Sequence, residues 1–141
     1  MNKTIRITNR ALWESVQPLS ALINERLPRK VSYTCGWNAE RVQRETKIIA
    51  EERTKIIREY AEKDAKGNPV INEEGIVQFA SVEDRLRAEE EIAELMAIEH
   101  EAFEYRPVCI DDIPEDAQIP GIVFMQLSWM FEEAPVEAEM E

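Results

Sequence analysis

The chain has 141 residues, of which 44% are hydrophobic and 33% are charged, and its formal net charge is -12. This length and composition are typical of one globular domain and exclude a disordered or low-complexity chain. A single His and two Cys exclude a disulfide scaffold and a four-ligand Cys/His zinc site.

The charge is divided unevenly along the chain. Residues 1–71 contain 14 Lys and Arg against 9 Asp and Glu, whereas residues 72–141 contain 3 against 20. This pattern indicates two halves that partly neutralise each other, or a polarised surface that favours assembly or a basic partner. The acidic balance argues against general binding to DNA or RNA, because the affinity for nucleic acid comes from cations that neutralise phosphates.

The sequence contains no membrane or export signal. Its longest apolar stretches, such as residues 122–125, have about four residues, and a spanning helix needs about twenty. Residues 1–7 alternate in character and do not resemble the apolar core of a signal peptide. We therefore expect a cytoplasmic protein with two reduced thiols and no membrane contact.

The first third of the chain predicts a strand and a helix. Residues 4–7 alternate between polar and apolar side chains, which is typical of a short strand. Thr8 or Asn9 can cap a helix that runs to about Leu27. Pro18 lies inside this pattern and predicts either a kink or a second helix.

A second and much longer helix is predicted for residues 29–63. At 1.5 Å per residue it would extend for about 50 Å. Gly36 lies within it and is a candidate for a bend. Apolar residues repeat at intervals of seven along one side of this helix, namely Cys35, Val42, Ile49 and Ile56.

The remaining residues predict shorter elements. Residues 70–79 indicate a β-hairpin, and a capping sequence at Ser81 begins a helix that extends to His100. Residues 102–110 are expected to form a strand whose middle Pro107 limits to an edge or a bulge. A last, almost wholly apolar helix is predicted over residues 121–132.

These elements predict an α+β fold that is mainly α. Its body would be a long antiparallel helical hairpin with the small β-hairpin at its tip. The N-terminal strand would pair with residues 104–110. We expect a single domain over residues 1–133 and a loose acidic tail over residues 134–141.

Residues with reactive side chains do not form a catalytic or metal-binding motif. His100 lies among glutamates at the end of a predicted helix, where a solvated acidic helix end explains it better than a metal site. Cys35 and Cys109 lie between apolar residues and are expected to be buried thiols. The chain has no phosphate-binding glycine loop and no nucleophile elbow. We therefore expect no enzymatic activity and no cofactor.

Two sets of residues are candidates for binding. Aromatic and aliphatic side chains that suit either a core or an interface form the first set, namely Trp37, Val42, Ile49, Ile56, Phe124, Trp129 and Phe131. Cations on the long helix form the second set, a candidate basic face, namely Arg29, Lys30, Arg41, Arg44, Lys47 and Arg53.

The order of these elements resembles a group of small tailed-bacteriophage proteins. A Leu-rich helix ends in Leu27-Pro28-x-Lys30-Val31-x-Tyr33, and a long charged helix runs into Tyr60-Ala61-Glu62-Lys63-Asp64-x-Lys66-Gly67-Asn68. The resemblance covers residues 10–110 and implies a viral origin and a bacterial cytoplasm. It implies no catalytic residues.

Three functions are compatible with these observations. We expect first a non-enzymatic phage interaction protein, either a virion or assembly component or an inhibitor of a host protein. The alternatives are a nucleic-acid accessory protein that uses the basic face, and a sink for a small molecule or nucleotide at an oligomer interface. The length of the second helix also predicts self-association, because one layer of neighbours in so small a domain cannot cover it.

Overall fold

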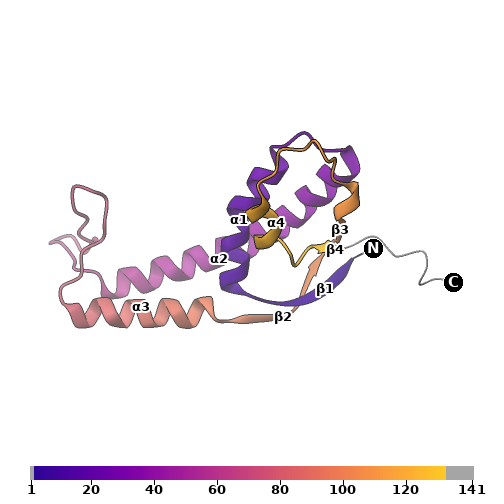
Figure 1. The fold of residues 1–141 in the computed structure, drawn as a ribbon. Coiled ribbons are helices and arrows are strands. Elements are labelled where there is room, and N and C mark those ends of the chain that lie inside the picture. Colours follow the sequence, from indigo (N-terminus) through magenta and orange to yellow (C-terminus); the bar gives the residue numbers. More distant parts are fainter. Residues whose placement is uncertain (1, 133–141) are drawn as a thin grey trace. The chain divides into compact units, whose positions relative to one another are not determined.

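The computed structural model describes residues 2–132, of which about 54% are helical, and has the expected α+β class. Figure 1 shows the elements in chain order. They are β1 (Lys3–Thr8), α1 (Asn9–Ile23), α2 (Arg29–Tyr60), α3 (Val82–Met96), β2 (Glu99–Tyr105), β3 (Val108–Cys109), the 3-10 turn η1 (Ile110–Asp112), α4 (Gly121–Gln126) and β4 (Phe131–Glu132). The tail predicted for residues 134–141 lies outside the described residues.

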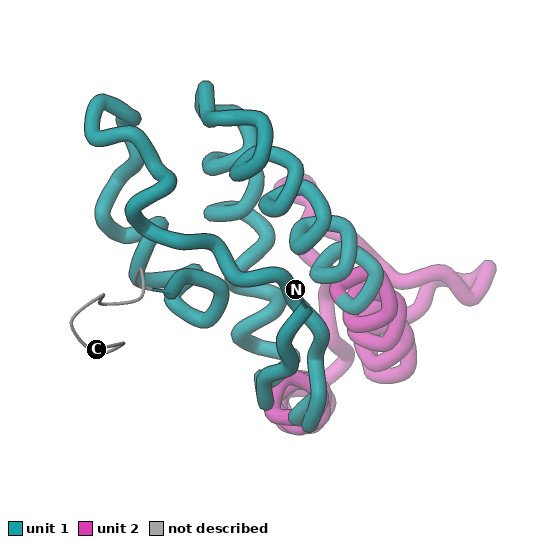
Figure 2. Tube along the Cα trace, turned by 90° about the vertical axis from the view of Figure 1, so that its right-hand side faces the viewer, with its two compact units in different colours: residues 1–45, 99–141 teal, residues 46–98 magenta. Residues whose placement is uncertain are grey.

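The chain divides into two compact units, which Figure 2 shows in different colours. The first unit contains residues 1–45 and 99–141, and the second contains residues 46–98. The helix α2 contributes its first part to the first unit and its second part to the second unit.

In the first unit, β1 and β2 form an antiparallel pair. Lys3 lies opposite Tyr105 and Thr8 opposite Glu99, with an irregular register between Ile5 and Ile7. The N-terminal strand therefore pairs with residues 99–105, and the predicted partner, residues 104–110, was placed too late in the chain. Because Pro107 has no N–H, the ladder cannot continue through it.

The helix α1 begins where the sequence predicts and ends earlier. The hydroxyl of Thr8 accepts a hydrogen bond from the N–H of Ala11 at 3.1 Å, which caps the helix. Pro18 lies inside one continuous helix, so the alternative of two helices is wrong. The helix ends at Ile23, four residues before the predicted end at Leu27.

The helix α2 is continuous through Gly36, and no bend interrupts its hydrogen bonding there. It ends at Tyr60, three residues before the predicted end. Its buried stripe joins the core of the first unit through Val31, Cys35 and Val42. The core also contains Leu12, Leu19 and Leu22 of α1, Phe103 of β2, and Leu127 and Met130 near the C-terminal end.

The second unit contains the predicted β-hairpin and α3. Ile71 lies opposite Val77, and the N–H of Asn72 donates to the carbonyl of Ile76 at 2.9 Å. The hydroxyl of Ser81 caps α3 by accepting from the N–H of Asp84 at 3.1 Å. The helix α3 ends at Met96, and residues up to His100 are not helical, which corrects the predicted boundary.

The apolar C-terminal segment is only partly helical. The helix α4 ends at Gln126, and Phe131–Glu132 forms a strand that runs parallel to Val108–Cys109. The predicted helix over residues 121–132 is therefore wrong in its second half. The helix α4 packs against α1, and the indole N–H of Trp129 donates to the hydroxyl of Ser15 at 3.0 Å. This segment completes the core of the first unit.

Candidate functional site

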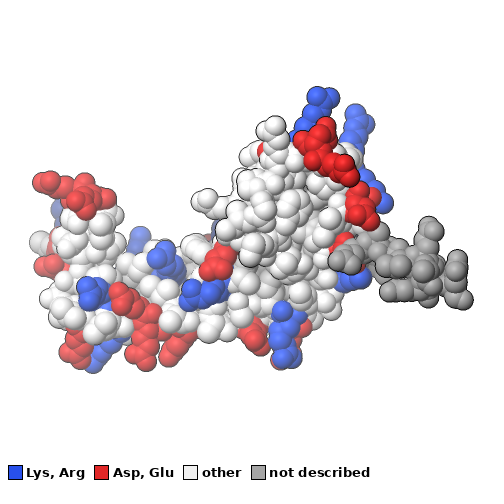
Figure 3. All heavy atoms as spheres, in the orientation of Figure 1, with Lys and Arg blue, Asp and Glu red and all other residues white. Residues whose placement is uncertain are grey.

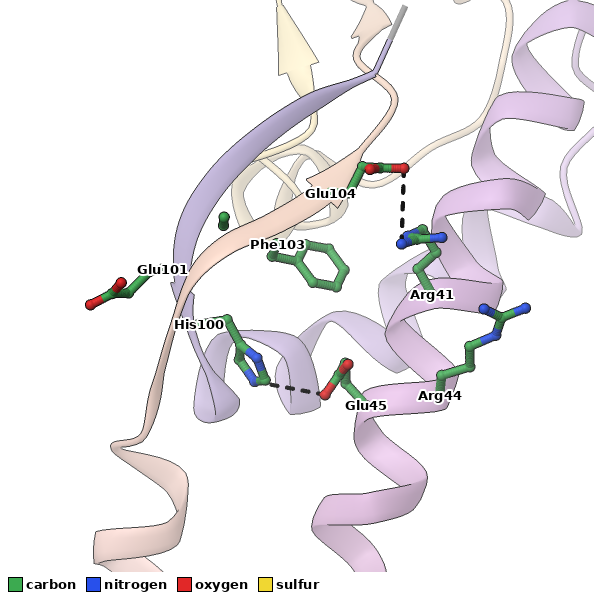
Figure 4. A pocket seen from close by; sticks show the side chains of 8 residues that line it. Arg41, Arg44, Glu45, His100, Glu101, Phe103 and Glu104 are labelled. Atoms are coloured by element: carbon green, nitrogen blue, oxygen red, sulfur yellow. Dashed lines mark ion pairs between the residues drawn. The ribbon is translucent and has the colours of Figure 1, made fainter.

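In the first unit, α2 and β2 line a pocket of about 390 Å³ (Figure 4). Arg41, Arg44 and Glu45 come from α2, and residues 100–104 come from β2. One ion pair and one histidine–carboxylate contact connect the walls, because Arg41 Nη2 lies 3.9 Å from Glu104 Oε1 and His100 Nε2 lies 3.9 Å from Glu45 Oε2. The phenyl ring of Phe103 lies between these two pairs.

His100 is held by a buried amide at the start of α1. Its Nε2 lies 2.6 Å from Oδ1 of Asn9, so an Nε2–H donates to that oxygen. The sequence predicted a solvated helix end, whereas the structure places His100 on a strand facing the pocket. Within residues 2–132, no group of three or more His, Cys, Asp or Glu side chains is arranged to hold a metal ion.

A second polar contact fixes the chain just after β2. Asn38 is fully buried on α2, and its Oδ1 accepts from the N–H of Arg106 at 2.8 Å. Its Nδ2 donates to the carbonyl of Arg106, also at 2.8 Å. The Asn38 side chain thus takes the place of a strand partner for Arg106, because the ladder cannot continue through Pro107. It also fixes the main chain from which the Arg106 side chain extends.

The Arg106 side chain stacks on aromatic residues of α2. Its guanidinium carbon lies 4.4 Å from the ring centroid of Trp37 and 5.8 Å from that of Tyr33. The guanidinium carbon of Arg41 lies 4.7 Å from the Trp37 centroid. We call Tyr33, Trp37, Arg41 and Arg106 the arginine–aromatic surface. Cation–π contacts of this kind contribute about 0.5–1 kcal/mol each at exposed sites.

Asn2 connects the two arginines through Glu104. Arg106 Nε donates to Asn2 Oδ1 at 3.0 Å, and Asn2 Nδ2 donates to Glu104 Oε1 at 2.8 Å. Since Glu104 also faces Arg41, a closed ring of contacts runs through Arg106, Asn2, Glu104, Arg41 and Trp37. The ring holds both guanidiniums beside the pocket.

Asn2, Asn38 and Arg106 were not among the candidate residues predicted from the sequence. A signal for Asn38 was present, since it lies three residues after Cys35 and four before Val42 on the apolar stripe. A polar residue at a buried helical position needs a hydrogen-bond partner. The partner itself comes from 68 residues further along the chain, and no local pattern indicates it.

The predicted basic residues do not form one face. Arg41 and Arg44 lie at the pocket, and Arg44 Nη2 lies 2.6 Å from Glu40 Oε1. Arg29 and Lys30 are exposed at the start of α2, and within residues 2–132 neither forms an ion pair. Lys47 and Arg53 belong to the second unit. Arg53 follows Arg44 by nine residues, which is about two and a half turns, so it lies on the opposite side of α2.

Most of the predicted apolar interaction surface is core. Val42 and Ile49 are 0% and 2% exposed, so neither can contribute to an exposed surface. Ile56 is half-buried. Phe131 and Trp129 pack against the core, and the Trp129 ring meets Phe103 and Tyr105 edge-on at 5.9 and 5.7 Å. Phe124 is half-buried against Phe131, with 5.2 Å between ring centroids. Trp37 alone among these seven residues belongs to the arginine–aromatic surface.

The two thiols differ in environment. Cys35 is fully buried in the core, and this burial raises its pKa to about 11. Cys109 is half-buried in β3. A raised pKa leaves little thiolate at neutral pH, which is the opposite of what a nucleophilic Cys needs.

Comparison with protein-family models, curated proteins and solved structures finds no match to this chain. Within residues 2–132, none of the helices has both the length and the apolar composition needed to cross a membrane.

Proposed function

We propose that this chain is a non-enzymatic interaction protein that binds a protein partner through its arginine–aromatic surface. The observation that carries the proposal is the state of Arg106. Its guanidinium is stacked on two aromatic rings and hydrogen-bonded through Nε, yet it has no carboxylate partner within residues 2–132. Arg, Trp and Tyr are the residues that contribute most often to hot spots at protein interfaces.

The surface is ordered before any partner binds. Asn38 fixes the main chain of Arg106, and Asn2 fixes its Nε. A flexible arginine loses about 0.5–1.5 kcal/mol of side-chain entropy when a partner immobilises it, and this arginine has already lost much of that freedom. Tyr33, 69% exposed, adds an amphipathic ring beside it. These features support a binding role for the surface.

The chemistry of the surface favours a carboxylate from a protein. The two Nη groups of Arg106 form a planar fork that matches a carboxylate or a phosphate. Glu40, Glu45 and Glu104 lie around the neighbouring arginines and would repel a polyphosphate backbone. A side-chain carboxylate is a point contact and avoids most of this repulsion.

A nucleic-acid accessory role is the second candidate. Exposed Arg29 and Lys30 precede Tyr33 on α2, and an exposed ring beside cations can stack a base. Short labelled DNA and RNA at moderate salt separate the two roles. Binding at micromolar protein that weakens in Tyr33→Ala would favour this second candidate.

A nucleotide sink is less favoured by the pocket. Arg41 faces Glu104, Arg44 is paired with Glu40, and His100 faces Glu45. A nucleotide phosphate would therefore have to displace a carboxylate from Arg41 and from Arg44. Thermal stabilisation by nucleotides would support this third role.

The resemblance to small phage proteins guides the choice of cellular role. It supports a virion or assembly component, or an inhibitor of a host protein, in a bacterial cytoplasm. The proposal includes the antiparallel helical hairpin of α2 and α3, supported by the effect of Glu91 of α3 on Tyr60 of α2, whose pKa it raises to about 12. Self-association stays a prediction, and it no longer involves the buried Val42 and Ile49.

The proposal is tested by affinity capture from cells that produce the protein. Wild type, Tyr33→Ala and Arg106→Ala are compared with Arg10→Ala, which changes an exposed arginine on α1. We expect one protein to be retained by wild type and by Arg10→Ala, and to fall at least tenfold with the other two. Equal retention by all four variants would contradict the proposal.

A further inference from the structure

The second unit exposes large apolar side chains where the hairpin meets α3. Ile76 and Val82 are 55% and 64% exposed, and Ile71 and Leu86 are exposed to a similar degree. Val82 and Leu86 are four residues apart on α3 and therefore lie on the same face. Clustered apolar side chains at the surface of a folded chain are typical of an interaction site.

The surface is hollowed, and two hydrogen-bonded turns lie in the same unit. A groove of about 490 Å³ is lined by Ile76, Val77, Phe79, Val82 and Arg85, among others. The two turns are similar, because Asp64 and Asn72 each accept two main-chain N–H bonds through Oδ1. Gly67 and Gly75 complete these turns with φ of +82° and +81°, where a side chain would be strained.

The rim of the groove is acidic. Glu73 and Glu74 lie in the turn before Ile76, and Glu83 and Asp84 follow Val82 on α3; the three glutamates are exposed and Asp84 is half-buried. Arg85, which lines the groove, faces Glu89 at 3.9 Å, and Arg87 faces Glu83 of the rim at 2.7 Å. Within residues 2–132, Glu73 and Glu74 form no ion pair, so they carry the uncompensated negative charge of the rim. Figure 3 shows acidic side chains over the hairpin and along α3, with uncharged surface between them.

From this arrangement we infer a second binding surface that takes a basic amphipathic helix from a partner protein. Apolar side chains of that helix fill the groove, and its Lys or Arg side chains face the acidic rim. A second copy of this chain would bring the same acidic rim against the first and be repelled. The inference is independent of the arginine–aromatic surface, since the two surfaces share no residue.

A designed peptide provides the probe. It has 18 residues, with Leu at helical positions i, i+3, i+4 and i+7 and Lys at most others, and carries a fluorophore. A scrambled peptide of the same composition has no apolar face, and a third peptide has Glu in place of Lys. The protein variants are Val82→Ser and Leu86→Ser on the surface, with Ile122→Ser on exposed α4 as the matched control.

The amphipathic basic peptide should bind wild type and Ile122→Ser with micromolar affinity at physiological salt, and each surface variant at least fivefold more weakly. The scrambled and acidic peptides should bind at least tenfold more weakly. Circular dichroism checks that each variant folds. If one of the two surface variants does not fold, the other one still provides the test.

Several results would overturn the inference. One is equal binding of the scrambled peptide, which would mean attraction by net charge alone. Others are equal or tighter binding of the acidic peptide and unchanged affinity in both folded surface variants. A further one is no binding at 100 μM, since a dissociation constant of that size corresponds to about 5.5 kcal/mol of binding free energy. A wild-type dimer that Val82→Ser dissociates would show that the occupant is a second copy and would also overturn it.

Discussion

The buried amide of Asn38 hydrogen-bonds both main-chain groups of Arg106, with both distances at 2.8 Å. This contact joins α2 to the segment after β2, at the point where Pro107 ends the ladder. Because the Arg106 side chain then lies over Trp37, the buried Asn38 determines the position of the half-buried Arg106. Asn38 is therefore a positioning residue for the arginine–aromatic surface.

Replacing Asn38 by Leu should lower the free energy of unfolding by about 2 kcal/mol. The substitution leaves an N–H and a carbonyl without a partner in a part-buried place. Urea unfolding at neutral pH measures the change. Gln17→Ala, on the exposed side of α1, should change stability by less than about 0.5 kcal/mol. Equal stability of Asn38→Leu and wild type would show that the contact is not formed.

Gly36 offers a test of the continuous helix. A Cβ added at Gly36 meets no atom within 4 Å, and the residue lies inside α2. Gly36→Ala should therefore stabilise the chain by about 0.5–1 kcal/mol. Gly67→Ala and Gly75→Ala should destabilise it by about 1 kcal/mol, since both glycines have positive φ. Thermal melts of the three variants compare these effects, and a destabilised Gly36→Ala would indicate a bend.

Trp129 and Trp37 should respond differently to truncation. Trp129 hydrogen-bonds Ser15 and packs against Phe103 and Tyr105, so Trp129→Ala should cost about 3 kcal/mol. Trp37→Ala removes two cation–π contacts at the surface and should cost about 1 kcal/mol. Denaturant midpoints measured on both variants compare the two losses of stability. A larger loss for Trp37 would place it in the core and contradict its assignment to the surface.

The thiols should separate in their reactivity. With its pKa raised to about 11 by burial, Cys35 is almost wholly protonated at pH 8 and should react with a thiol reagent only after unfolding. Cys109, half-buried in β3, should react in the folded chain, and Cys109→Ser should remove that phase. Two thiols that react at one rate in the native protein would contradict the burial of Cys35.

Local patterns predicted the elements whose signals are local. The seven-residue stripe predicts α2, and Ser81 predicts the start of α3, because each depends on neighbours within a few turns. The strand containing His100 was missed because Met96-Ala97-Ile98 can continue a helix. Its strand conformation comes from pairing with β1, about ninety residues earlier. The same applies to Phe131, which pairs with Val108.

The candidate site was less predictable than the fold. Trp37 and Arg41 were identified as candidates, but the sequence gives no sign that Arg106 stacks on that indole. The contact needs Asn38 to fix a segment far along the chain, and tertiary pairing overrides local preference there. Burial also decided between core and interface for Val42 and Ile49, since a stripe of apolar residues looks the same whether a partner or the chain itself covers it.

Photo-crosslinking at position 33 tests the central claim most directly. A benzophenone amino acid replaces the exposed Tyr33, and in a parallel chain it replaces Gln17 of α1. After irradiation in the producing cells, we expect a discrete protein adduct from position 33, none from position 17, and loss of the first adduct when Arg106→Ala is added. The account would be contradicted by equal adducts at both positions, by an adduct that persists without Arg106, or by no protein adduct at position 33.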